Sequence, residues 1–187
     1  PLTRLKLQLA MLKQQDLAKK MSEDIEEMER MLNEYLEFSR HQKNEETEKV
    51  NINNMINEVV KKYENRQIDI SVEKSLEINI RPNSIKRCLT NLIDNGLSYG
   101  KNVSVLSNKT KGNILIFVDD DGPGIPENEY QNVMKPFYRI DKSRSQNKSG
   151  VGLGLSIAND IIRSHGGNIS LDKSPLGGLR ATISLPV

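Results

Sequence analysis

The amino-terminal part of the sequence allows little other than helix. From Pro1 to about Lys43 it contains no glycine, and its only proline is Pro1, which the first turn of a helix tolerates. Apolar residues recur there at three- and four-residue steps in two runs, with a polar break near QQD between them: Leu2, Leu5, Leu9 and Leu12, then Met21, Ile25, Met28, Leu32 and Tyr35. This pattern predicts an α-helical hairpin over residues 1–44. Its second helix, roughly 40 Å long, would leave an apolar stripe half covered, so we expect the hairpin to dimerise as a four-helix bundle.

A polar stretch, HQKNEETEKVN, separates this hairpin from the rest and predicts a solvated linker at residues 45–51. Residues 52–187 form a second predicted domain, in which helical and strand periodicities alternate. Helices are expected at about 52–63, 83–98, 127–134 and 154–165, and strands over IDISVE, LEINI, NVSVLS, NILIFVD, NISLDK and LRATISLPV. This succession predicts an α+β fold, a two-layer α/β sandwich with helices on one face of the sheet.

Composition excludes several classes of protein. With 27 Lys and Arg against 25 Asp and Glu, the chain has no overall field that would attract nucleic acid. Cys88 is the only cysteine, and no Cys/His cluster has the spacing of a zinc site, which favours a reducing compartment, the cytoplasm. No apolar run approaches the roughly 20 residues that span a bilayer. The first residues lack the layout of a signal peptide, so we expect this piece of the protein to be soluble.

Two asparagines, Asn91 and Asn95, lie four residues apart in the predicted helix CLTNLIDNGLSYG and therefore share one face of it. Such a pair is most often exposed to solvent, but asparagine has a low helix propensity, so two of them inside one helix suggest a function. An asparagine oxygen can ligate magnesium without adding negative charge, and the amide group can donate to phosphate oxygens. The pair is therefore a candidate site for a nucleotide and its metal.

The stretch DDDGPGI, Asp119–Ile125, places three carboxylates directly before two glycines. Its spacing does not fit a calcium loop, because the fifth and twelfth ligand positions would be Pro123 and Tyr130. A paired general acid and base remains open, although neighbouring carboxylates of a strand point to opposite faces of the sheet.

A different use fits this stretch better. A carboxylate at the end of a buried strand can accept a hydrogen bond from an exocyclic amine, and following glycines allow positive φ and close approach of the backbone to a ligand. We therefore expect Asp120, Gly122 and Gly124 to recognise adenine. Asp119 and Asp121 are interpreted as solvated or turn-forming flanks of the strand end.

The turn GVGLGL, Gly150–Leu155, runs straight into a predicted helix, whose amino end offers free N–H groups to an anion. Leu155 stands where a Rossmann fingerprint has its third glycine, and no GK[ST] follows as in a P-loop. A nucleotide fold of another kind is therefore required, and the turn alone is a weak indication of it.

Together these motifs resemble, in the same order, the four boxes of sensor histidine kinases. Asn91 and Asn95 match the asparagine box, DDGPGI the first glycine box, KPFYR the phenylalanine box and GVGLGL the second glycine box. PLTRLKL is similar to the sequence just after the phosphoacceptor histidine of the dimerisation helix, so the resemblance covers essentially the whole chain. RPNSIKRCLTNLIDNGLSYG is especially similar to osmosensor kinases of the EnvZ type.

The resemblance implies a Bergerat-type ATP-binding domain with a mixed sheet, joined to the dimeric hairpin, in the cytoplasmic portion of an inner-membrane sensor protein. Such a protein-histidine kinase transfers the γ-phosphoryl of Mg-ATP to a histidine, for relay to an aspartate of an OmpR-type response regulator. Asn95 would hold Mg²⁺, Asn91 would support the phosphates and Asp120 would read adenine. Arg139 would supply positive charge to the triphosphate. The remaining nucleotide-binding residues that it implies are Tyr99, Gly122, Gly124 and Ile125 around the base, and Gly150, Gly152, Leu153 and Gly154 in a lid over the phosphates.

The chain departs from the family pattern at three points. The acceptor histidine would lie upstream of Pro1, and neither His41 nor His165 fits its place, so these 187 residues alone are not expected to phosphorylate themselves. Ser98 stands where relatives often have a basic residue that contacts phosphate, and three basic residues of the lid segment are candidates to replace it: Lys142, Arg144 and Lys148. Gly96 replaces a common alanine, which costs about 1 kcal/mol of helix propensity but allows a ligand or neighbouring element to approach closely.

Two other functions stay open from the sequence. In gyrase-like ATPases a glutamate base matches Asn91, and an amide cannot take a proton from water, so we expect slow hydrolysis and transfer to a protein nucleophile. The alternatives are a gyrase- or MutL-like ATPase, which Asn91 disfavours, and a degenerate scaffold that binds nucleotide, or nothing, and works by dimerising and docking a regulator. The intact Asn95, Asp120 and lid glycines argue against the scaffold.

Overall fold

The computed structural model describes residues 45–63, 66, 68–72, 76–140 and 152–187, and eight single positions between 19 and 32. The chain divides into two units, Pro1–Lys43 and Asn44–Val187. In the first unit the described residues are helical, as predicted: Lys19, Met21, Ser22, Ile25, Glu26, Met28, Glu29 and Leu32. Ile25 is buried, whereas Met21, Met28 and Leu32 are exposed. The rest of the predicted hairpin, including its turn and His41, lies outside the described residues.

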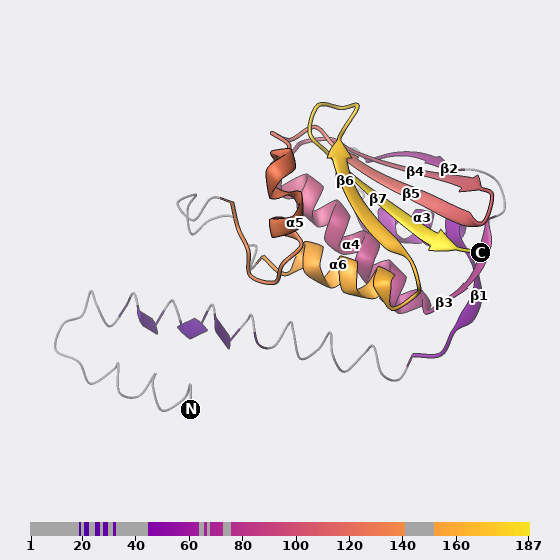
Figure 1. Ribbon diagram of the computed structural model, residues 1–187, viewed down its shortest axis with the longest axis horizontal. Helices are drawn as coiled ribbons and strands as arrows, with labels where there is room; N and C mark the ends of the chain where they lie inside the picture. The colour runs from indigo at the N-terminus through magenta and orange to yellow at the C-terminus, as the bar shows by residue number, and fades with distance from the viewer. Residues whose placement is uncertain are drawn as a thin grey trace. The chain divides into compact units, whose positions relative to one another are not determined.

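The second unit is built on two sheets (Figure 1). The larger has the order β2-β4-β5-β7-β6. Only the β2/β4 pair is parallel, so the sheet is mixed, as expected. Its strands are β2 (Ile68–Val72), β4 (Val103–Thr110), β5 (Asn113–Asp120), β6 (Asn168–Lys173) and β7 (Leu179–Pro186). A smaller antiparallel sheet joins β1 (Glu48–Asn51) to β3 (Glu77–Ile80).

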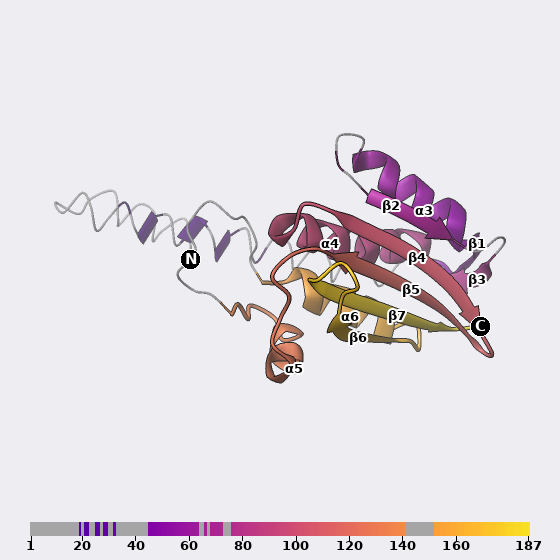
Figure 2. The same ribbon diagram turned by 90° about the horizontal axis from the view of Figure 1, so that it is seen from above.

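Three helices cover one face of the larger sheet (Figures 1 and 2). They are α3 (Ile52–Val60), α4 (Pro82–Tyr99) and α6 (Gly154–Arg163). Side chains alternate between buried and partly exposed along β4, β5 and β7, as expected for strands with one face against a helical layer. The shorter elements are η1 (Lys61–Tyr63), η2 (Glu127–Glu129) and α5 (Tyr130–Val133). The predicted two-layer sandwich is confirmed, with the core between the sheet and these helices.

The predicted linker is the main difference from expectation. Residues Glu48–Asn51, assigned to a solvated linker, form β1 and pair with β3. Glu45 is likewise engaged, because its carboxylate accepts hydrogen bonds from the start of α4. The mixed-charge composition of this stretch concealed a short edge strand, whose exposed positions are polar. The linker interpretation is therefore wrong for these residues.

The ends of several helices and strands lie together at one end of this unit. The carboxyl ends of α4 and β5, the β6–β7 turn and the amino end of α6 all lie there in Figure 1. The aspartate–glycine stretch at the end of β5 and the described part of the second glycine box fall on these ends, and Asn95 lies near the carboxyl end of α4. No helix in the described part of the chain is both long and apolar enough to cross a membrane.

Candidate functional site

Helix α4 carries the asparagine pair; it is capped at its amino end and packed along one face. Pro82 occupies its first turn, where the missing N–H costs nothing. The carboxylate of Glu45 supplies the cap that Arg81 does not: it accepts from the backbone N–H groups of Asn83 and Ser84, at 3.0 Å for Ser84, and from Ser84 Oγ at 2.6 Å. Buried apolar residues then hold the helix against the sheet: Ile85, Leu89, Leu92 and Ile93.

Asn91 and Asn95 lie half-buried on the flank of α4. Asn91 Nδ2 donates to the backbone oxygen of Gly154 at 3.4 Å, a long bond that marks where α4 meets the start of α6. The Asn95 side chain makes no hydrogen bond within the described part of the chain, so its amide remains able to bind a ligand. No group of three or more His, Cys, Asp or Glu that could hold a metal occurs among the described residues.

The three consecutive aspartates have three separate environments. Asp119 is 1% exposed and pairs with Arg180, whose Nε and Nη2 donate to its two oxygens at 2.7 and 2.8 Å. The Arg180 guanidinium also lies 4.8 Å from the centre of the Phe117 ring. The expectation that Asp119 is a solvated or turn-forming flank is therefore wrong, because β5 continues through Asp120 and is paired with β7 at this point.

Asp121 organises the loop that follows α4, which agrees with its predicted turn-forming role. Its Oδ1 accepts from the backbone N–H groups of Lys101 and Asn102 at 2.6 and 2.9 Å, and its Oδ2 accepts from Asn102 Nδ2 at 2.6 Å. These bonds lower the pKa of Asp121. The loop between α4 and β4 is thus held against the end of β5.

Asp120 is the buried member that faces the site. It is 7% exposed, and its Oδ1 accepts from the backbone N–H groups of Gly122 and Leu179 at 2.9 and 3.1 Å. Its Oδ2 makes no hydrogen bond within the described residues, and no buried side-chain oxygen among them lacks a partner, so Oδ2 is open to solvent or a ligand. Burial raises the pKa of Asp120, and the two amide hydrogen bonds offset part of this rise.

The glycines around Asp120 serve close packing more than unusual backbone angles. Gly124 has φ +70°, as expected, but Gly122 does not have positive φ. A Cβ on Gly122 would lie 2.9 Å from Asp120 Oδ1 and 3.2 Å from the Tyr99 backbone. A Cβ on Gly96 would lie 2.9 Å from Val103 and 3.3 Å from the Cβ of Asp120. Gly96 therefore lets α4 pack closely against β4 and β5, and the side chain of an alanine at this position would be too close to Val103.

The phenylalanine box and the second glycine box meet at the other side of the site. The Phe137 N–H donates to the Gly152 carbonyl at 2.9 Å, and Gly152 has φ +75°. Phe137 itself has φ 64°, a conformation that costs a bulky residue free energy and is held here by its surroundings. Tyr138 Oη and Asn132 Nδ2 both donate to the Glu129 carboxylate, which lowers the pKa of Glu129. These bonds hold the phenylalanine box against η2 and α5.

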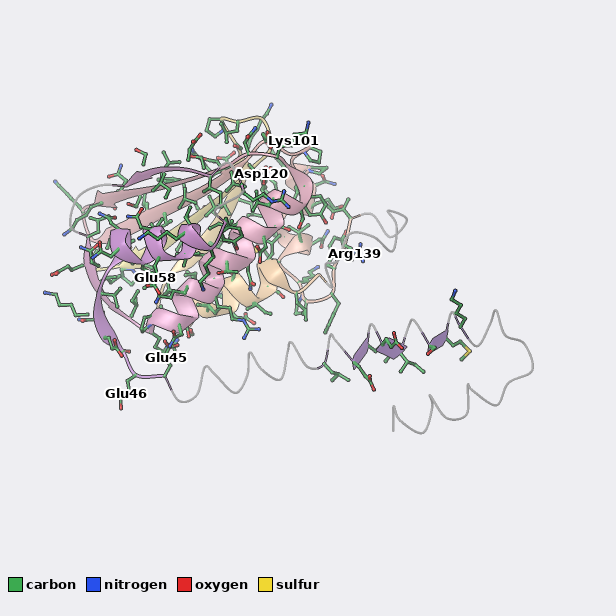
Figure 3. The ribbon with its side chains drawn as sticks, turned by 180° about the vertical axis from the view of Figure 1, so that it is seen from behind. Glu45, Glu46, Glu58, Lys101, Asp120 and Arg139 are labelled. Carbon is green, nitrogen blue, oxygen red and sulfur yellow. The ribbon has the colours of Figure 1, made fainter. Side chains whose placement is uncertain are left out.

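The remaining predicted residues are distributed around the same end of the domain. Figure 3 shows Asp120 and Lys101 near the end of β5, with Arg139 where the chain leaves α5. Tyr99 is exposed at the last turn of α4, and Ile125 is half-buried. Leu153 and Gly154 begin α6, whose first turn has no side-chain cap and so leaves N–H groups for an anion. Gly150 and the predicted lid, with Lys142, Arg144 and Lys148, lie outside the described residues.

His165 has a structural role. Its Nδ1 lies 2.7 Å from the Ile161 carbonyl, and its Nε2 accepts from the Arg81 N–H at 3.1 Å. Burial and the neighbouring Arg81 lower the pKa of His165, so the ring is neutral at physiological pH. Both ring nitrogens are therefore engaged within the domain.

Sequence reasoning missed three contributors: Glu45, Arg180 and Gly178. Two of these contributions come from hydrogen bonds between residues far apart in the chain, Glu45 with Asn83 and Arg180 with Asp119. No local sequence pattern predicts such contacts. The Gly-Gly pair in SPLGGLR is typical of a turn between two strands. Such a pair does not indicate that Gly178 donates its N–H to the backbone oxygen of Asp120, at 3.1 Å.

Comparison with known proteins identifies the fold of this end of the chain. The family model described as histidine kinase-, DNA gyrase B- and HSP90-like ATPase matches residues 80–187. The chain belongs to this family. The sensor histidine kinase GtrS of Pseudomonas aeruginosa is 31% identical over 188 residues, which cover 100% of this chain and 39% of GtrS. The sensor histidine kinase CpxA of Escherichia coli is 35% identical over 205 residues, covering 100% of this chain and 44% of CpxA.

A solved structure gives the same result. The histidine kinase domain of the E. coli osmosensor EnvZ matches with a TM-score of 0.59 and 33% identity, over 75% of this chain and 88% of that domain. The chain thus contains the catalytic ATP-binding domain of sensor histidine kinases. It spans 39% of the length of GtrS and 44% of that of CpxA.

Proposed function

We propose that this chain is the cytoplasmic catalytic part of a sensor histidine kinase, which binds Mg-ATP and transfers its γ-phosphoryl group to a histidine upstream of Pro1. The observation that carries the proposal is that Asn91 contacts the amino end of α6, while Asp120 lies beside Gly96 further along the same helix α4. Each has the chemistry that one part of ATP requires. The proposal covers nucleotide recognition, phosphate binding and the transfer step in turn.

Adenine recognition is assigned to Asp120 and its neighbours. Because Oδ1 already accepts two backbone hydrogen bonds, Oδ2 is the atom that would accept from the 6-amino group. Gly122 and Gly124 would let the base approach the backbone, and Tyr99 and Ile125 would pack near it. Selectivity for adenine then follows from a fixed acceptor that a 6-oxo base cannot satisfy.

The triphosphate is assigned to the region between α4 and α6. Asn91 and the uncapped N–H groups that follow Leu153 would donate to phosphate oxygens, and Arg139 would add positive charge. Asn95 Oδ1, with phosphate oxygens and water, would hold Mg²⁺ without a carboxylate cluster. The metal, when bound, supplies the charge that neutralises the triphosphate. Gly150, Gly152, Leu153 and Gly154 would belong to a lid over the phosphates, with Gly152 and Gly154 as its hinges.

Transfer needs a nucleophile from outside this domain. Asn91 cannot act as a base toward water, so hydrolysis would be slow and transfer to histidine preferred. His165 has both ring nitrogens engaged, which supports an acceptor elsewhere in the protein. The exposed Met21, Met28 and Leu32 support a hairpin that dimerises through an apolar face and presents that acceptor.

Partners and location follow from this assignment. We propose a homodimer formed through the hairpin, relay to an aspartate of an OmpR-type response regulator, and upstream membrane segments in an inner-membrane sensor. The similarity to EnvZ-type osmosensors stays a prediction, since GtrS and CpxA are comparably similar over the whole chain.

Calorimetric titration of ATP with Mg²⁺ tests the assigned site. The wild-type chain should bind ATP with a measurable heat. Asn95→Ala should abolish this binding or raise the Kd for ATP at least about tenfold, because the metal and phosphate contacts are lost. Asn83→Ala is the matched control, because Asn83 is an exposed asparagine at the opposite end of the same helix. Equal affinity in the wild type and Asn95→Ala would exclude Asn95 from the site. No binding by the wild type would favour the scaffold.

A further inference from the structure

The β6–β7 turn, Ser174–Gly178, and the first residue of β7, Leu179, each donate a backbone hydrogen bond to Asp120. The Gly178 N–H donates to the Asp120 carbonyl oxygen at 3.1 Å. The next N–H, that of Leu179, donates to the Asp120 side-chain Oδ1 at 3.1 Å. Two successive amides, at the end of the turn and the start of β7, therefore hold both the main chain and the side chain of the same aspartate.

Gly178 leaves no room for a side chain at this contact. A Cβ there would lie 2.1 Å from Asp120 Oδ1, 2.5 Å from the Gly122 nitrogen and 2.6 Å from the Asp120 carbonyl oxygen. All three atoms belong to a fixed segment, so a substitution must push the carboxylate or the turn aside. The Gly178 carbonyl is also close to Gly124, at 3.4 Å from the position of a Cβ on that residue. Two glycine segments thus pack backbone against backbone around the carboxylate.

The turn is rigid enough to act as a fixed support. Ser174 is 4% exposed, its N–H donates to the Gly178 carbonyl at 2.9 Å, and its carbonyl accepts from Gly177 at 3.0 Å. The Ser174 Oγ accepts from the Leu176 N–H at 3.0 Å. Gly177 has φ +105° and no atom within 4 Å of its Cβ position. Gly177 therefore serves the shape of the turn, whereas Gly178 serves the contact with Asp120.

We propose that Gly178 is a positioning residue for base recognition: through it the β6–β7 turn fixes the Asp120 carboxylate so that Oδ2 alone faces the ligand. A single oriented oxygen distinguishes a 6-amino group from other substituents better than a carboxylate that can rotate. In a rotating carboxylate, either oxygen or a water molecule could occupy the position that faces the base. This inference rests on the proposed reading of adenine by Asp120.

The test compares two triphosphates on the 187-residue chain. Kd values are measured by calorimetry for ATP and for purine riboside triphosphate, which lacks the 6-amino group, with Mg²⁺ present. In the wild type ATP should bind at least about tenfold more tightly, as expected for one hydrogen bond to a charged acceptor. Gly178→Ala should bring the two Kd values within about twofold of each other, mainly by weakening ATP. A purely structural loss would weaken both triphosphates equally and leave their ratio unchanged.

Gly177→Ala is the matched control. It strains the same turn through its positive φ but places no atom against Asp120, so the ratio of the two Kd values should stay as in the wild type. A folded Gly178→Ala that keeps the wild-type ratio would overturn the positioning role while leaving Asp120 as the reader of adenine. A wild type without any preference would refute the assignment of Asp120, and the inference with it.

A second measurement covers the case in which Gly178→Ala does not fold. In the wild type the amide resonance of Leu179 should shift with pH in step with the titration of the Asp120 carboxyl, because the two are hydrogen-bonded. Asp120→Asn should remove that shift. A Leu179 amide that does not follow the titration in the wild type would show that the turn does not hold the carboxylate in solution.

Discussion

Replacing Asp120 by asparagine separates its contribution to ligand binding from its contribution to folding. Asparagine has the same shape, and its Oδ1 can still accept from the N–H groups of Gly122 and Leu179. Nδ2 would then stand in place of Oδ2, the oxygen that faces the site. A hydrogen-bond donor would replace an acceptor at the one position assigned to the adenine amine.

The expected loss of ATP affinity follows from that exchange. A hydrogen bond to a charged group contributes about 1.5–3 kcal/mol, which corresponds to roughly a 10- to 150-fold change in Kd. Inosine triphosphate carries a 6-oxo acceptor that suits the new donor. Asp120→Asn should therefore weaken ATP within this range and lower the preference for ATP over inosine triphosphate at least about tenfold. Both Kd values are measured by calorimetry in the presence of Mg²⁺.

Asp120→Asn should lower ATP affinity but raise the free energy of unfolding relative to the wild type at neutral pH. Burial raises the pKa of Asp120 in the folded chain above that of an unfolded aspartate, about 3.9. Between these two pKa values the folded state binds a proton that the unfolded state lacks, so this group's contribution to stability is present at low pH and is lost as pH rises. Asparagine does not titrate. The free energy of unfolding of Asp120→Asn, from urea denaturation, should therefore gain on the wild type as pH rises from 4 to 8.

One result would refute this reasoning. An Asp120→Asn chain that binds ATP with wild-type affinity, and prefers it over inosine triphosphate as before, would show that the buried carboxylate does not read the base. Reduced binding together with reduced stability at pH 8 would instead mean that the substitution disturbs the fold, and the assignment to adenine would lose its support.

Other predictions concern the frame of the site. Glu45→Ala should lower the free energy of unfolding by about 1 kcal/mol through loss of the α4 cap, whereas the neighbouring Glu46→Ala should change it by less than about 0.5 kcal/mol; Figure 3 labels both residues. Arg180→Met should cost about 3 kcal/mol in urea denaturation, because it leaves the Asp119 carboxylate buried without its partner, and Asp119→Asn should cost less, because Arg180 is partly exposed. Cys88 is fully buried, which raises the pKa of its thiol, so a thiol reagent should label it only after unfolding, as followed by mass spectrometry.

The elements that local periodicity specifies could be predicted from the sequence. Helix α4 was expected at 83–98 and spans Pro82–Tyr99, because a run of buried residues at helical spacing follows a proline suited to the first turn. The strands with alternating burial were found for the same reason. Asp120, Gly124 and Gly152 were also placed correctly at strand ends and turns, since such positions depend on neighbours in the sequence.

Contacts between distant segments could not be predicted in this way. Glu45 caps a helix 38 residues further along the chain, and Asp119 pairs with an arginine 61 residues away. The sequence around Asp119 suits a solvated strand end as well as a buried ion pair, and only the pairing of β5 with β7 decides between them. Gly178 belongs to the same class, because the atoms that exclude its side chain come from β5 and the glycine segment after it.

Transfer of phosphate between two chains tests the central claim most directly. The 187-residue chain is mixed with a longer chain that carries the upstream histidine but has Asn95→Ala, so that only the shorter chain can bind Mg-ATP. Formation of mixed dimers is verified by co-purification through different tags, and γ-labelled ATP is then added. We expect acid-labile label on the longer chain, and none when the shorter chain also carries Asn95→Ala. Mixed dimers that bind ATP through the shorter chain yet leave the longer chain unlabelled would contradict the proposed kinase.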